Sequence, residues 1–244
     1  MSRPSRTSHL SAVRPGVALS LLALLLLAGC ASQVQRTTET LPRGDGPPRI
    51  VLMPIDLELS VLSAGGVEEP RAEWTAAAHE HVRAAFAAEA RARGMELFEH
   101  DPARGDATEQ RTVSDLVKLH RAVGQAILLH KYLPGQQLPS KEADFDWSLG
   151  PEVATIARLQ QADYALFFFM RDSYASSGRV ALIVVAAVMG VGVPGGAQVG
   201  FASLVDLNSG DVVWFNRFAR GTGDLRTADG AREMVRVLLD EAPR

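Results

Sequence analysis

The spacing of apolar and polar residues along this chain predicts alternating strands and helices. Short apolar runs rich in β-branched and aromatic residues indicate strands, and longer stretches with apolar residues at three- and four-residue steps indicate amphipathic helices. The predicted strands lie at about 49–53, 95–98, 162–174, 197–206 and 211–218. The predicted helices lie at about 69–93, 113–132, 151–161 and 227–241. This order favours a mixed α/β fold with one sheet of about five strands and helices packed on it.

The last part of the chain carries a strong hairpin signal. Residues 208–210 separate two β-type runs, and Gly210 readily takes the positive φ that a three-residue turn with a bulge requires. Thr227 is the expected N-cap of a final amphipathic helix. Residues 50–244 are therefore expected to form a single α/β domain that ends in a β-hairpin followed by a helix.

One apolar segment allows several interpretations. Residues 180–193 contain no polar side chain. As a helix this segment would be about 21 Å long, short of the roughly 30 Å hydrocarbon core of a bilayer. Burial between the sheet and its neighbours is the first expectation, because exposed apolar patches of this kind promote aggregation. A contact between subunits, or a strand or hairpin that enters a membrane on assembly, are the two alternatives.

A second apolar run, at residues 17–27, follows three arginines and no acidic residue. This arrangement is typical of a secretory signal peptide, and the run is too short to span a bilayer as a stable helix. Residues 1–29 are therefore predicted to be a signal peptide. The run ends in Leu27-Ala28-Gly29-Cys30, which resembles the lipobox of bacterial lipoproteins.

The lipobox resemblance implies that Cys30 becomes the first residue of the mature chain and carries a diacylglycerol, with palmitate among its acyl chains. Two or three acyl chains anchor a protein stably, whereas one holds it only reversibly. In lipoproteins of this kind an aspartate after the cysteine favours the inner membrane, and Ala31 stands there instead. We therefore expect a lipid anchor on the periplasmic face of the outer membrane. Residues 30–49, which contain few large apolar side chains, are predicted to form a lipidated flexible tether.

Charge and cysteine content exclude several kinds of partner and chemistry. The leader holds three of the 25 basic residues and none of the 28 acidic ones, which leaves 22 against 28 and a formal charge of −6. No basic run is interleaved with aromatic residues, so no nucleic-acid partner is expected. Cys30 is the single cysteine of the chain. Once it is acylated, no thiol is left for a disulfide, a nucleophile or a metal ligand.

Two further patterns are weak signals for a cofactor or a metal. Gly190, Gly192 and Gly195 match the spacing of a dinucleotide-binding loop, but a β-type run follows them where that motif requires a helix. His79 and His81 are two residues apart, so on a helix their side chains point about 200° apart and cannot share one ion. Neither a cofactor nor a metal site is predicted.

Asp144 and Asp146 are the carboxylate pair that best suits an enzyme. They flank Phe145 in a predicted loop that continues to Trp147, and such a loop could bind a cation or a sugar. The interpretation that we favour is an ordinary Asp-containing turn whose Phe145 and Trp147 pack into the core.

From residue 50 onward the pattern resembles the α/β domains of periplasmic lipoproteins related to the curli secretion channel and the amino-terminal domain of TolB. The resemblance rests on an early apolar strand with proline, a long helix, and a late strand pair that turns through Asp206-Leu207-Asn208-Ser209-Gly210, followed by Trp214. It implies no catalytic residue.

The leading hypothesis is a non-enzymatic envelope lipoprotein that acts as a scaffold or accessory subunit of an envelope assembly or secretion complex. It would bind a protein partner, or itself, through a sheet edge or residues 180–193. The alternative is a periplasmic enzyme that acts on glycan or peptide with Asp144 and Asp146.

Overall fold

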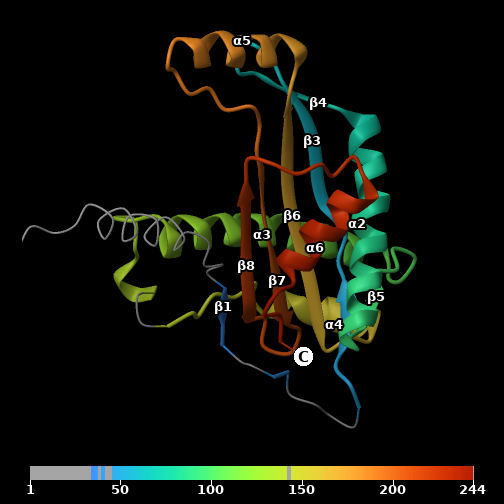
Figure 1. Ribbon diagram of the computed structural model, residues 1–244. Coiled ribbons are helices and arrows are strands. Elements are labelled where there is room, and N and C mark those ends of the chain that lie inside the picture. Colours follow the sequence, from blue (N-terminus) through green and yellow to red (C-terminus); the bar gives the residue numbers. More distant parts are fainter. Residues whose placement is uncertain (1–33, 38–39, 42–45, 142–143, 244) are drawn as a thin grey trace, which may run out of the picture. The chain divides into compact units, whose positions relative to one another are not determined.

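The computed structural model describes residues 34–37, 40–41, 46–141 and 144–243. This part of the chain forms one mixed sheet of eight strands with helices on its faces (Figure 1). The strands are β1 (Gln35–Arg36), β2 (Arg49–Leu52), β3 (Asp56–Leu62), β4 (Glu68–Pro70), β5 (Glu96–Glu99), β6 (Tyr164–Ala175), β7 (Gln198–Asp206) and β8 (Val212–Arg220). The helices are α2 (Ala72–Arg93), α3 (Ala107–Tyr132), α4 (Ala154–Gln160), α5 (Ser177–Val188) and α6 (Ala228–Leu238), with short 3-10 turns at Pro139–Lys141 and Pro151–Val153.

The twelve-residue strand β6 is the centre of the sheet. Its first half pairs in parallel with β2, its second half pairs in parallel with β3, and its other edge pairs along its length with antiparallel β7. β2 and β3 are separated by residues 53–55, where Pro54 lacks the N–H that a continuous ladder would need. Beyond these strands the order runs β7-β8-β1 on one side and β2-β5 on the other.

The predicted mixed α/β class is confirmed, and the five predicted strands are present as β2, β5, β6, β7 and β8. The expected number of about five is too low, because β1, β3 and β4 were not predicted. β3 has the alternating burial of a half-exposed strand, with Leu57 and Leu59 buried and Glu58 exposed. β1 and β4 hold only two and three residues, too few for a periodic signal.

Two apolar cores lie on opposite faces of the sheet. α2 and α6 contribute to one core, where Phe86 and Met234 pack in the same cluster as Trp214. Val113 of α3 and Ile156 of α4 belong to the other, together with Phe201 and Phe215 from the sheet. Because β6 has helices on both faces, its residues from Tyr164 to Met170 are buried without alternation.

Several predicted boundaries are confirmed, and one helix starts earlier than expected. Residues 206–211 form the turn between β7 and β8, with the N–H of Gly210 donating to the carbonyl of Asp206 at 2.8 Å. Thr227 caps α6 through the N–H of Gly230 at 3.1 Å. α3 begins at residue 107, where the sequence predicted 113, because Asp106 and Glu109 form a reciprocal capping box.

The segment predicted to be a flexible tether, residues 30–49, is partly packed on the sheet. Gln35 lies opposite Phe215 and Arg36 opposite Trp214 in the β1–β8 ladder, and Leu41 is 2% exposed in the core. The structure therefore differs from the expected tether at these residues. Cys30 and the predicted signal peptide lie outside the described residues. None of the helices in the described ranges is both long and apolar enough to cross a membrane.

Candidate functional site

The connection between β6 and β7 is unusually long for neighbouring antiparallel strands. Their ladder ends with Asp172 opposite Gln198, and hairpin connections commonly need about two to five residues. Here residues 176–197 intervene and form α5 and an irregular return segment. Figure 1 shows α5 beyond the ends of the strands and lying across their direction. The connection therefore places an apolar helix at one end of the sheet, away from both cores.

Most apolar side chains of α5 are exposed. Val188 is 84% exposed and Met189 74% exposed, and Ala186 is the one buried residue of the helix. We call the large exposed residues the α5 apolar surface: Val180, Leu182, Val184, Val185, Val188, Met189 and Val191. The first expectation for residues 180–193, burial between the sheet and its neighbours, is therefore wrong. It fails because the helix lies past the end of the sheet, where no other described element covers it.

The exposed surface extends around more than half of the helix. At about 100° per residue, the exposed positions from 180 to 189 span an arc of about 220°. Ile183 and Ala186 occupy the remaining side, and a Cβ built on Gly195 would lie 3.4 Å from the Cδ1 atom of Ile183, so this side faces the return segment. A helix that packs on one neighbour typically uses an apolar stripe about 100° wide. The α5 apolar surface is thus wider than one neighbouring helix would cover.

Both ends of α5 are closed by hydrogen bonds. Ser176 Oγ accepts from the N–H of Arg179 at 3.1 Å. At the other end Gly190, at φ 75°, allows a Schellman motif in which the N–H groups of Gly190 and Val191 donate to the carbonyls of Ala187 and Ala186 at 3.0 and 2.9 Å. The outer end of the helix therefore satisfies backbone groups that would otherwise need water.

Arg179 ties the start of α5 to two other segments. Its guanidinium donates to the carbonyl of Pro194 at 3.0 Å and to that of Ala64 at 3.3 Å. The first bond holds the return segment, and the second holds the turn between β3 and β4. Val67 in that turn is also exposed, so the same end of the molecule carries a further apolar side chain.

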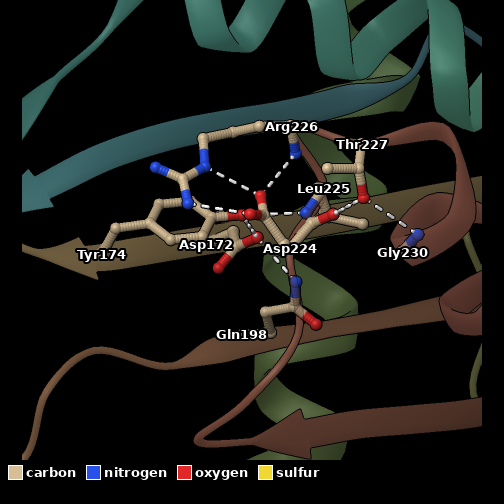
Figure 2. Close-up of polar contacts among 8 residues, drawn as sticks. All are labelled: Asp172, Tyr174, Gln198, Asp224, Leu225, Arg226, Thr227 and Gly230. Atoms are coloured by element: carbon tan, nitrogen blue, oxygen red, sulfur yellow. Dashed lines mark hydrogen bonds and ion pairs between the residues drawn. The ribbon is translucent and has the colours of Figure 1, made fainter.

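A partly buried polar cluster lies at the base of this connection; Figure 2 shows its contacts. We call Asp172, Tyr174, Gln198, Asp224 and Arg226 the base cluster. The Tyr174 hydroxyl and the Gln198 amide both donate to Asp172, the latter at 2.6 Å. The Tyr174 oxygen accepts from the N–H of Leu225 at 2.9 Å. The cluster thus joins β6, β7 and the loop before α6.

Charge in the base cluster is partly compensated. Arg226 makes a bidentate pair with Asp224 at 2.8 Å for each contact, and its guanidinium lies 4.0 Å from the ring centre of Tyr174. The hydrogen bonds from Arg226 lower the pKa of Asp224. Burial raises the pKa of Asp172, which the hydrogen bonds from Tyr174 and Gln198 oppose, and burial also raises the pKa of Tyr174. The arrangement suits a rigid base for the α5 connection, since each carboxylate has a partner.

The carboxylates predicted from the sequence do not form a closed site. Asp144 and Asp146 are exposed, and Asp146 is paired with Lys141 at 2.8 Å, which lowers the pKa of Asp146. Phe145 and Trp147 pack against the core on the α3 face, so the predicted packing role of these two rings is confirmed. Gly190, Gly192 and Gly195 lie in the return segment, which has no helix after it.

A cavity of about 480 Å³, which was not predicted, lies where parallel strands β2 and β5 end. Its polar lining comes from His79, Arg83, Glu99 and His100. His100 Nε2 is buried with no hydrogen-bond partner in the described part of the chain, and burial lowers the pKa of both histidines. Arg83 is paired with Glu99 at 3.3 Å, so their charges compensate. Among the residues described, no group of three His, Cys, Asp or Glu side chains could hold a metal ion.

The fold and the α5 apolar surface together define the class: a mixed α/β protein whose long β6–β7 connection carries a helix with an exposed apolar surface. No protein-family model matches the chain, and no curated protein matches it. Among solved structures, the PelC dodecamer from Paraburkholderia phytofirmans is similar with a TM-score of 0.36 and 16% identity, over 88% of this chain and 99% of that chain. A single-substitution variant of the same PelC has a TM-score of 0.35 and 16% identity, over 87% and 99% of the two chains. The LpoB C-terminal domain from Salmonella enterica has a TM-score of 0.23 and 14% identity, over 82% and 93%. This similarity is weak and assigns no function.

Proposed function

We propose that this protein is a membrane-anchored, non-enzymatic envelope lipoprotein that acts as a scaffold or accessory subunit. Its lipid anchor is Cys30, on the periplasmic face of the outer membrane, and its docking surface is the α5 apolar surface. The observation that carries the docking role is the exposure of seven large apolar residues on one connection. An apolar patch of this kind on a folded surface marks an interaction site, because leaving it in water favours aggregation.

The base cluster supports the docking role of α5. Docking a helix that projects on a flexible connection would cost conformational entropy, and a fixed base reduces that cost. The base cluster and the bonds of Arg179 hold both ends of the connection in place. A helix held in place in this way supports a role in binding a partner.

The anchor is tested by metabolic labelling with radioactive palmitate. The wild-type chain is expected to incorporate the label and the Cys30→Ser variant to lose it, because Cys30 is the single cysteine of the chain. A wild-type protein that remains unlabelled, with its leader attached, would contradict the proposed anchor.

The docking surface is tested by cysteine labelling in intact envelopes. Val188→Cys places a thiol at the most exposed position of α5, and Leu129→Cys, at an exposed position on α3, is the matched control. We expect a water-soluble maleimide to label both variants in detergent, but only Leu129→Cys in envelopes. Equal labelling of the two in envelopes would show that nothing covers α5. The chain without either substitution is labelled in parallel and shows how much maleimide reacts at Cys30.

The alternative function, a periplasmic enzyme for glycan or peptide, depends on Asp144 and Asp146. Lys141 favours the ionised form of Asp146, which makes that carboxyl a poor proton donor near neutral pH. The double variant Asp144→Asn with Asp146→Asn is expected to leave the envelope phenotype of the strain unchanged. A phenotype equal to that of the deletion would favour the enzyme.

A further inference from the structure

We propose that the α5 apolar surface inserts into the same membrane leaflet that holds the acylated Cys30, so that α5 is a second attachment point. This inference rests on the proposed function, because it names what covers the docking surface. It commits to the acyl chains of a lipid leaflet as the occupant. Three observations carry it: the width of the surface, its chemistry, and the direction of β1 together with the length of chain between β1 and Cys30.

The width of the surface favours a surrounding medium over a single protein neighbour. The exposed arc of about 220° is more than twice the stripe that one packed helix usually covers. A second copy that pairs through α5 would leave about half of the apolar arc in water. Acyl chains adapt to the whole exposed arc, including Val188 and Met189 at the outer end.

The chemistry of the surface fits hydrocarbon. Protein interfaces usually have a polar rim around an apolar centre, and residues 180–193 supply no polar side chain for such a rim. Backbone groups that enter hydrocarbon must be satisfied within the protein. The Schellman motif at Gly190 and Val191 meets this requirement at the outer end of the helix.

The depth of insertion is limited to one leaflet. Twelve helical residues are about 18 Å long, against roughly 30 Å for a whole hydrocarbon core. Arg179 remains at the base of the connection, with its guanidinium on two carbonyl groups. Glu68 and Glu69 are exposed near the same base. Charges of both signs are mixed at this end, where Arg71, Arg179 and Arg226 lie near Glu68, Glu69 and Asp224, so no preference for anionic lipid is expected.

The N-terminal end of β1 points toward the end of the sheet that carries α5. β1 is antiparallel to β8, with Gln35 opposite Phe215 and Arg36 opposite Trp214, so β1 begins on the side of β8 that ends at Arg220. Arg220 lies opposite Gln198, at the base of the α5 connection. Cys30 precedes Gln35 by five residues, and an extended chain of this length spans at most about 18 Å. The same number of residues separates Phe215, opposite Gln35, from Arg220 at the end of β8. The chain between Cys30 and Gln35 is therefore long enough for the lipid anchor to reach the level of the α5 base.

The test measures the depth of α5 in protein-free vesicles. The full, acylated chain is reconstituted in vesicles of phosphatidylcholine and phosphatidylethanolamine, with a nitroxide label on Val188→Cys or, as the control, on Leu129→Cys. Electron paramagnetic resonance then compares relaxation by oxygen, which enters hydrocarbon, with relaxation by a water-soluble nickel chelate. We expect the label at position 188 to lose its response to nickel and gain response to oxygen, while the control stays accessible to nickel. Added phosphatidylglycerol should not change this result.

Two outcomes would overturn the inference. In the first, the label at position 188 remains as accessible to nickel as the control on the same vesicles. In the second, it shows spin–spin broadening that disappears on dilution with unlabelled protein, which would identify a second copy as the occupant. Attachment of the protein to the vesicles through the acyl chains of Cys30 alone would leave the label at position 188 accessible to nickel, so the anchor does not produce the expected result. If position 188 is protected in native envelopes but not in protein-free vesicles, the proposed docking function stands and the lipid occupant is wrong.

Discussion

His120 on α3 is enclosed by the core, and its ionisation makes the stability of the fold depend on pH. The residue is 2% exposed, its Nε2 lies 2.9 Å from Ser203 Oγ, and its ring stacks on Phe167 at a centroid distance of 4.8 Å. Burial lowers the pKa of His120 from 6.5 to about 3. The folded protein therefore holds this ring neutral through mildly acidic pH, whereas the unfolded chain protonates it.

The sign and size of the effect follow from proton linkage. Between pH 6.5 and pH 3 the unfolded chain binds more protons at His120 than the folded one, so stability falls as the pH falls through this window. The loss approaches about 1.4 kcal/mol for each pH unit once the unfolded histidine is largely protonated. From pH 7 to pH 5 the contribution of His120 is a loss of about 2 kcal/mol in the free energy of unfolding.

The assay is urea denaturation at pH 7 and pH 5 for the wild type and for His120→Gln, which keeps a polar group near Ser203. Asp172, His79 and His100, whose pKa values burial also shifts, titrate in both proteins and cancel in the comparison. The wild type should lose about 2 kcal/mol more than the variant between the two pH values. An equal loss in the two proteins would refute the reasoning. His81→Gln on α2 is the control for removal of a histidine that the core does not enclose.

Two further substitutions test packing and a buried hydrogen bond by urea denaturation. Gly124→Ala in α3 is expected to destabilise the fold by about 1–2 kcal/mol, because a Cβ there meets the Phe201 ring at 2.0 Å and overpacking outweighs the gain of about 1 kcal/mol in helix propensity. Gly178→Ala in α5 meets its nearest neighbour at 3.6 Å and should be neutral or stabilising; the opposite ranking would contradict the packing argument. Asn216→Ala removes a buried donor to the carbonyl of Leu238 at 2.7 Å and should cost about 1–3 kcal/mol, so an unchanged midpoint would contradict a role for this bond.

Local patterns were enough to predict much of the fold. The apolar runs of β2 and β6, the turn at Gly210 and the cap at Thr227 are signals within a few residues, and all are present in the structure. The number and order of strands were not accessible in this way. β1 and β8 pair across almost 180 residues of chain, so the β1–β8 contact depends on the folded sheet and leaves no local pattern.

The base cluster shows the same limit at the candidate site. Asp172 and Tyr174 lie in β6, Gln198 begins β7, and Arg226 precedes α6, so the cluster exists only because the β6–β7 register places Asp172 opposite Gln198. By contrast, the packing of Phe145 and Trp147 was predicted, since aromatic residues in a polar loop usually anchor it to the core. Asp144 and Asp146 were conspicuous in sequence but remain at the exposed surface.

The wrong prediction for residues 180–193 has a physical cause that also indicates where the protein acts. Apolar segments are expected to be buried in a protein that folds and functions alone in water. The apolar residues of α5 are exposed and do not follow this expectation. A second departure from ordinary local rules, the buried carboxylate of Asp172, lies at the same end of the sheet. Such departures are expected to gather at functional sites, because there the sequence is not selected for stability alone. The cavity lined by His79 and His100 departs less from these local rules, because the charges of Arg83 and Glu99 compensate each other there. The end of the sheet that carries α5 is therefore the first place to test for function.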